Sequence, residues 1–299
     1  MRYTKPPLTF EQQAQRLMDR GMIVPDRNQL IERLTAVSYY RLSGYWHPFK
    51  QADDTFKPGT TFETVWQRYI FDRQLRLLVM DAVERIEVAI LRTQMVEHFT
   101  LKYGPFGYID KRNFNPKFAG DEYNRLLTSI RDATSHSREI FVTHFFSKYR
   151  SENDLPLWMA VEVMSFGSLF TFFHNLHQSD KQILAQRIGV VPKVLDSWLH
   201  TFNYIRNLCA HHGRLWNREL SIAPFIPDRH HQLQWHQPVR IDNKRVFVVL
   251  TISRYLLKQI APQSGWYQRL IGLLNDYSAI PLIYMGFPPN WQDCPIWQG

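Results

Sequence analysis

The sequence predicts an all-α protein of about eight helices. Apolar residues recur at spacings of three and four in several long segments, which is the pattern of helices that bury one face. Capping residues or prolines precede several of these segments, where they favour the first turn of a helix. No segment shows convincing alternation of apolar and polar residues, and no glycine-rich phosphate loop occurs.

The first helices follow from their capping signals. Thr9 and Gln12 form a capping box, and the helix that they start is expected to end at Gly21. Pro25 and Asp26 then open a second helix.

A very long helix is expected next. Thr60 and Glu63 form a second capping box. Neither proline nor glycine interrupts the chain before Gly104, so we expect this helix to reach His98 or beyond.

The rest of the chain alternates between helical segments and loops. The segments expected to be helical are 122–149, 156–176, 179–188, 192 through the stretch 204–217, 243–259 and 265–277. The apolar tail, residues 280–299, is expected to pack on the helices. We therefore expect an N-terminal helical extension, residues 1–60, packed on a main helical domain, residues 61–299, that includes this tail.

Composition limits the function classes. The chain has 299 residues, a net charge of +9 and a pI near 9.5, which favour a polyanionic partner such as RNA or DNA. Two cysteines argue against a disulfide scaffold and fit a reducing cytosol. The N-terminus lacks the apolar core of a signal peptide, and the apolar run 157–173 is interrupted by Glu162. We expect a cytoplasmic protein with no membrane association. The histidines show no convincing ligand set, so we expect no metal site.

The stretch 204–217, YIRNLCAHHGRLWN, concentrates side chains that do chemistry. At helical spacing, one stripe is apolar and comprises Leu195, Trp198, Phe202, Ile205 and Cys209. The opposite stripe is polar and comprises His200, Asn203, Asn207, His211 and Arg214. Any surface helix shows such stripes, but this polar one lacks the glutamate and lysine that usually fill a solvated face.

Three residues of this stretch carry a family resemblance. Arg206, Asn207 and His211, as R-N-x-x-x-H, resemble the signature of HEPN-domain ribonucleases. The longer string CAHHGRLWNR is similar to the Abi-type branch, the AbiD/AbiF-like abortive-infection proteins of bacteria. Three further blocks resemble that family, residues 39–49, 71–92 and 155–173. The resemblance implies a HEPN-like helical bundle with additional N-terminal and C-terminal helices.

The same resemblance implies a metal-independent endoribonuclease that needs no cofactor and acts in abortive infection. Its substrate is expected to be RNA, and a small non-coding regulatory RNA is a further expected partner. His211 is expected to transfer protons, Arg206 to stabilise phosphate charge, and Asn207 to hold the imidazole or bind phosphate. HEPN proteins pair two domains so that two Arg–His sets face each other. The resemblance therefore implies a homodimer with a composite site.

Further residues are expected to support this site. His212 is a second candidate for proton transfer, and Arg214 for a phosphate contact. Glu84 or Glu87 is expected to hold Arg206 through a bidentate pair, although both also fit a solvated charged face.

A possible RNA contact precedes the long helix. Tyr40, Arg41 and Trp46 could stack RNA bases, or the aromatics could be packing residues. Two other functions remain open for the whole chain: an RNA-binding module without catalysis, and a subunit of a defence ribonucleoprotein complex.

Overall fold

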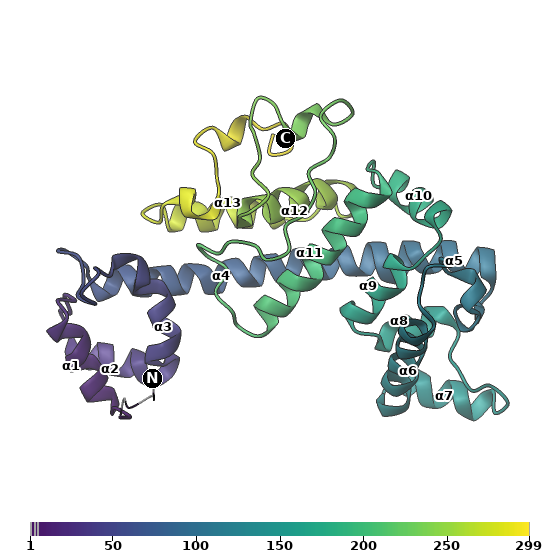
Figure 1. Cartoon of the computed structure of the whole chain (residues 1–299), viewed down its shortest axis with the longest axis horizontal. Coiled ribbons are helices and arrows are strands. Elements are labelled where there is room, and N and C mark those ends of the chain that lie inside the picture. Colours follow the sequence, from purple (N-terminus) through teal and green to yellow (C-terminus); the bar gives the residue numbers. More distant parts are fainter. Residues whose placement is uncertain (1, 3, 5, 299) are drawn as a thin grey trace. The chain divides into compact units, whose positions relative to one another are not determined.

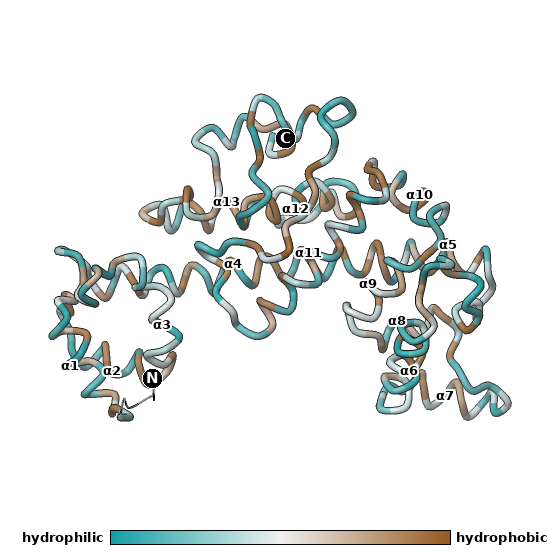
Figure 2. The backbone as a smooth tube through the Cα atoms, in the orientation of Figure 1, coloured by the Kyte–Doolittle hydropathy of each residue, from teal (hydrophilic) through white to brown (hydrophobic). Residues whose placement is uncertain are grey.

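The computed structural model describes residues 2, 4 and 6–298, and these residues form helices and isolated bridges but no strand (Figure 1). This confirms the predicted all-α fold. Polar and apolar residues alternate at short intervals along the helices (Figure 2), as expected where each helix buries one face. Among the described helices, none has the length and apolar character needed to cross a membrane.

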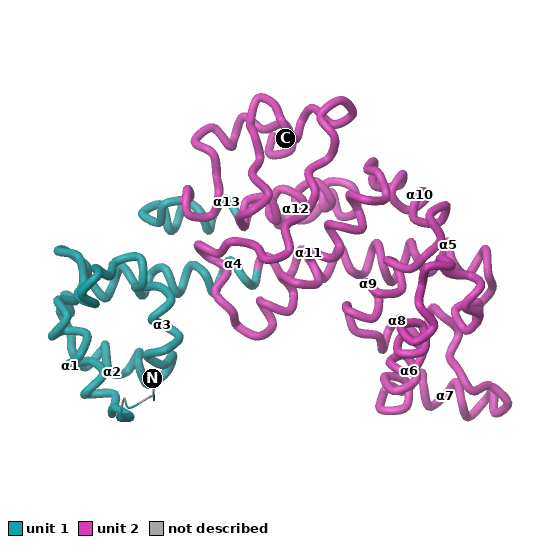
Figure 3. Tube along the Cα trace, viewed as in Figure 1, with its two compact units in different colours: residues 1–77, 270–281 teal, residues 78–269, 282–299 magenta. Residues whose placement is uncertain are grey.

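The chain divides into two compact units (Figure 3). Unit 1 comprises residues 1–77 and 270–281, and unit 2 comprises residues 78–269 and 282–299. The expected extension of residues 1–60 lies within unit 1, which continues into the long helix α4 (Phe62–Ile86).

Unit 1 begins with three helices that are capped by side chains. They are α1 (Phe10–Asp19), α2 (Arg27–Val37) and α3 (Tyr39–Trp46). The predicted capping box of Thr9 and Gln12 is confirmed. The cap of α4 lies one residue later than predicted, because Oγ1 of Thr61, rather than that of Thr60, accepts the N–H of Thr64 at 3.1 Å.

Helix α4 continues directly into a π-helical segment, Glu87–Gln94, and then into α5 (Met95–Tyr103). The predicted long helix is thereby confirmed. Gly104 ends it with a φ of 81°, which lies in the left-handed region that glycine adopts without steric cost. The sequence did not predict the π-helical segment, in which each turn is wider than in an α-helix and the backbone bonds join residues five apart.

Unit 2 contains most of the remaining helices. They are α6 (Gly120–His136), α7 (Ile140–Lys148), α8 (Leu157–Val163), α9 (Phe166–His174), α10 (Gln178–Arg187), α11 (Pro192–Ala210) and α12 (Val246–Ile260), while α13 (Trp266–Asp276) passes from unit 2 into unit 1. The predicted single helices 122–149 and 156–176 are each broken in two. Ser165 causes the second break, because its backbone is extended and its Oγ accepts the N–H of Ser168 at 3.1 Å to cap α9.

The apolar tail packs as predicted. Phe287, Trp291 and Trp297 are buried, and the ring centroids of Phe287 and Phe247 of α12 lie 4.5 Å apart. Nε1 of Trp297 donates a hydrogen bond to Oγ1 of Thr251 at 3.1 Å. The tail therefore closes the core of unit 2 over α12.

Candidate functional site

Helix α11 carries the candidate site, and its buried apolar stripe determines which of its faces points away from the core. Pro192 occupies the first turn, where the missing N–H costs nothing. The five residues of the predicted apolar stripe are all buried: Leu195, Trp198, Phe202, Ile205 and Cys209. Since this stripe anchors the helix in unit 2, residues on the opposite side are turned away from the core.

The helix ends earlier than predicted, at Ala210, so the stretch 204–217 is not one helix. His211 is the C-cap, and His212 follows with a φ of 57°. The N–H of His212 donates to the carbonyl of Cys209 at 3.0 Å, and the N–H of Gly213 donates to that of Leu208 at 2.8 Å. This pair of bonds is the Schellman motif, with histidine in the left-handed position that glycine usually takes.

Gly213 lies directly after the left-handed residue and packs against the last turn of α11. A Cβ at this position would lie 2.3 Å from Cδ1 of Leu208 and 3.1 Å from the Leu208 carbonyl oxygen. The residue is therefore required for close approach of the chain to the last turn of α11, rather than for a left-handed backbone.

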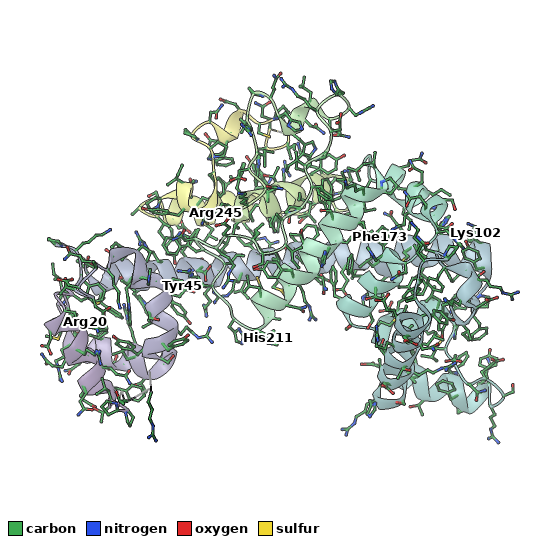
Figure 4. The ribbon with its side chains drawn as sticks, viewed as in Figure 1. Arg20, Tyr45, Lys102, Phe173, His211 and Arg245 are labelled. Carbon is green, nitrogen blue, oxygen red and sulfur yellow. The ribbon has the colours of Figure 1, made fainter. Side chains whose placement is uncertain are left out.

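Arg206, Asn207 and His211 lie together on the last turn and cap of α11, where Figure 4 marks His211. Asn207 and His211 are exposed, and Arg206 is half-buried. Nη1 of Arg206 donates to Oδ1 of Asn207 at 3.3 Å, and the backbone N–H of His211 donates to the Asn207 carbonyl at 3.0 Å. Among the described residues, no carboxylate forms an ion pair with Arg206, so its charge is available to an anion.

The predicted support from Glu87 takes another form. Its Oε1 accepts from Nε and Nη2 of Arg92 at 3.0 and 2.5 Å, so this carboxylate is engaged by Arg92 and does not hold Arg206. The two residues are five apart, and they face each other because the segment between them is π-helical. Glu84 is exposed and likewise forms no ion pair with Arg206 among the described residues.

Arg92 also reaches the end of α8. Its Nη2 donates to the carbonyl of Met164 at 3.0 Å, and its Nη1 donates to the carbonyl of Val161. A cation at a helix C-terminus interacts favourably with the last carbonyls of the helix. Sequence reasoning missed this role because an ordinary helix does not bring residues five apart to one face.

The residues that follow the helix anchor its end. Trp216 is fully buried and meets Tyr284 edge to face at 6.0 Å, and Leu215 is buried beside it. Arg214, which was predicted to contact phosphate, is half-buried, and its carbonyl accepts from Nε of Arg218 at 2.6 Å. The string after His211 thus holds the end of α11 against the body of unit 2.

The three residues of unit 1 predicted to contact RNA differ in their exposure to solvent. Tyr40 is 88% exposed and Arg41 is also exposed, so both are accessible. Trp46 has no exposed surface and meets Tyr39 edge to face at 4.9 Å. A buried indole cannot stack a base, so the prediction for Trp46 is wrong and the packing alternative holds.

The described residues contain no group of three or more histidine, cysteine, aspartate or glutamate side chains that could hold a metal ion. No curated protein and no solved structure matches the chain. A family model described as Abi-like protein matches residues 32–217, more than half of the chain and all of α11. The chain therefore belongs to the Abi-like protein family.

Proposed function

We propose that this chain is a metal-independent endoribonuclease of an abortive-infection system, with a HEPN-type site formed by Arg206, Asn207 and His211. The Abi-like family suggests a role in abortive-infection defence. The observation that carries the proposal is the joint placement of these three residues at the C-terminal end of α11, with no acidic partner for Arg206 among the described residues.

The proposed chemistry uses the nucleophile that RNA itself carries. The 2′-oxygen attacks the neighbouring phosphorus while a base takes its proton, and the bond from phosphorus to the 5′-oxygen breaks as an acid donates a proton to that oxygen. The products are a 2′,3′-cyclic phosphate and a 5′-hydroxyl. His211 is the proton-transfer group, and Arg206 stabilises the charge on the pentavalent phosphorane.

One histidine cannot act as acid and base in the same concerted step. We propose that two chains pair, so that His211 and the partner subunit's His211 take the two roles. Asn207 then orients its imidazole or binds a phosphate oxygen, which an amide can do as donor and as acceptor. Arg206 is exposed enough to reach the same phosphate from the flank of the helix.

His211→Ala and Arg206→Ala test the proposal against matched controls. The controls are His230→Ala and Arg229→Ala, which remove the same side chains from exposed positions in the loop after α11. Each protein is expressed in bacteria, which are challenged with phage so that any trigger is supplied. Extracted RNA is then analysed for 2′,3′-cyclic phosphate ends, and purified protein is incubated with labelled RNA in EDTA.

Wild type and both controls are expected to produce these ends, and the two site variants to lose them. Cleavage that EDTA abolishes, cleavage that survives in His211→Ala, or equal cleavage of all-deoxy substrate would overturn the proposal. If His211→Ala still protects cells and binds RNA as wild type does, the chain is an RNA-binding module instead.

A further inference from the structure

Unit 2 contains an open cleft of about 790 Å³ beside α11. It lies between the start of α6, helix α9 and the chain that follows α9. Its lining is mostly polar and comprises Asn115, Lys117, Glu122, Arg125, Leu126, Ser129, Ser165, Gly167, Ser168, Phe170, Thr171, His174, Asn175 and Lys181. None of these residues belongs to the Arg206–His211 site.

Helix α9 connects this cleft to the polar stripe of α11. The two helices pack in opposite directions, and three contacts follow one another along them. Nδ1 of His174 lies 2.9 Å from Asp196, and the ring of Phe170 stacks on that of His200 at 5.0 Å and 8°.

The third contact joins Gly167, which lines the cleft, to Asn203, which lies one helical turn before Asn207 of the candidate site. A Cβ at Gly167 would lie 3.9 Å from Oδ1 of Asn203. Asn207 and His211 follow Asn203 at intervals of four residues, or roughly 6 Å of helix axis each. The cleft and the candidate site thus border one continuous helix face.

The lining of the cleft offers hydrogen-bonding groups suited to a sugar. Oγ of Ser168 lies 3.1 Å from Oγ of Ser165 and 3.3 Å from Oγ of Ser129, so three hydroxyls form a chain. Oγ of Ser129 also donates to the carbonyl of Leu126, and Oγ of Ser165 accepts the N–H of Ser168. Since a hydroxyl can donate one bond and accept two, the chain keeps acceptor capacity for the hydroxyl groups of a ligand. Helix α9 also begins here, and the positive end of its dipole favours an anionic group nearby.

Cations line the rim. Lys117 is exposed and forms no ion pair among the described residues, while Arg125 is 4.0 Å from Glu122 with both side chains well exposed. Lys181 is buried and lies 3.6 Å from Asp196, which also pairs with His174. Two positive charges, those of Lys117 and Arg125, are therefore free enough to contact phosphates.

We propose that this cleft binds the ribose–phosphate backbone of a single-stranded RNA beside the bond cleaved at the Arg206–His211 site. This inference rests on the proposed function. Serine hydroxyls would contact ribose, Lys117 and Arg125 would contact phosphates, and the exposed face of His200 would stack a base on the way to Asn207. An open, polar cleft fits a chain ligand better than an enclosed small molecule.

The test measures binding without cleavage. In the full-length His211→Ala background, Lys117→Ala with Arg125→Ala is compared with the control pair Lys148→Ala with Arg138→Ala, which removes the same charges from exposed positions away from the cleft. The probes are a short labelled single-stranded RNA and its all-deoxy counterpart, titrated at several salt concentrations. A third variant, Ser168→Ala, tests the hydroxyl chain.

The cleft pair is expected to weaken RNA binding about tenfold and to reduce the slope of log affinity against log salt by about 1.4, as two lost phosphate contacts would. The control pair should leave both unchanged, and Ser168→Ala should weaken RNA binding more than DNA binding. Equal behaviour of the two pairs, or an equal effect of Ser168→Ala on RNA and DNA, would overturn the inference.

The two proposals fail separately. If His211-dependent cleavage occurs but the cleft pair binds RNA as the control pair does, the cleft assignment fails and the nuclease stands. If the cleft pair loses RNA binding while infected cells show no 2′,3′-cyclic ends, the nuclease fails and the cleft remains an RNA site.

Discussion

Replacing Arg92 with methionine should lower the free energy of unfolding of unit 2 by about 3 kcal/mol, the lower end of the loss expected when one partner of a buried ion pair is removed, because this pair is partly buried. The Arg92 and Glu87 side chains are only 16% and 13% exposed. Methionine keeps much of the apolar stem, so the loss reports the charge and the hydrogen bonds to the carbonyls of Met164 and Val161.

The assay is hydrogen exchange of the amides of α8 and α9, because these helices adjoin the pair and unfold with it. Arg85→Met is the matched control. Arg85 and Asp81 also pair on the long helix, but their side chains are 39% and 25% exposed. Loss of such a pair should cost less than about 1 kcal/mol.

A double-mutant cycle separates the two possible partners of Glu87. Glu87→Gln and Arg92→Met should couple by more than about 1 kcal/mol, because they share one interaction. Glu87→Gln and Arg206→Ala should add within about 0.5 kcal/mol. Coupling of Glu87 to Arg206, without coupling to Arg92, would contradict the observed pair. It would instead support the pair of Glu87 and Arg206 that the sequence predicted.

Three further predictions concern stability. His212→Gly should change the free energy of unfolding by no more than about 1 kcal/mol and preserve RNA cleavage, because glycine adopts the left-handed φ freely. Loss of cleavage would instead assign the imidazole a chemical role. Gly213→Ala should destabilise by about 1–3 kcal/mol in thermal denaturation, because the methyl group meets Leu208; an unchanged melting temperature would contradict the close approach. Burial alone would raise the pKa of Asp180, but hydrogen bonds from Lys102 and two other side chains of α5 outweigh it and hold the pKa below 3.8. Its contribution is therefore complete above pH 3.8 and is lost as the pH falls through the folded value, so the stability difference from Asp180→Asn should shrink on acidification; a constant difference would refute this.

Sequence periodicity predicted the buried face of α11 residue by residue, because helical spacing alone decides which side chains share a stripe. It did not predict where helices end. Ser165 was read as part of one helix, since serine is tolerated inside helices as well as at their caps. The end at Ala210 depends on bonds to Cys209 and Leu208 that only a left-handed His212 makes possible, and histidine is an uncommon residue there.

Contacts between distant segments were the least predictable. Glu87 and Arg92 face each other only in a π-helical turn, and the carbonyls that Arg92 binds come from a helix some 70 residues further along. Trp46 could not be assigned from composition, because the same aromatic residue serves as core or as stacking platform. The cleft beside α9 was missed for a similar reason, since its serines and cations come from separate helices.

The polar residues of α11 fall into two groups. Some contact α9, and others lie beyond the residue at which α9 begins. Asp196 and His200 contact side chains of α9, so their polar or aromatic character has a packing reason. Asn207 and His211 lie beyond that contact and have no such reason, which strengthens the functional interpretation of these two residues alone. The boundary depends on the corner before α9, whose carbonyls Arg92 holds. If that corner shifted, α9 would cover more or less of the stripe. Arg92→Met should therefore reduce cleavage as well as stability, although Arg92 is no part of the candidate site.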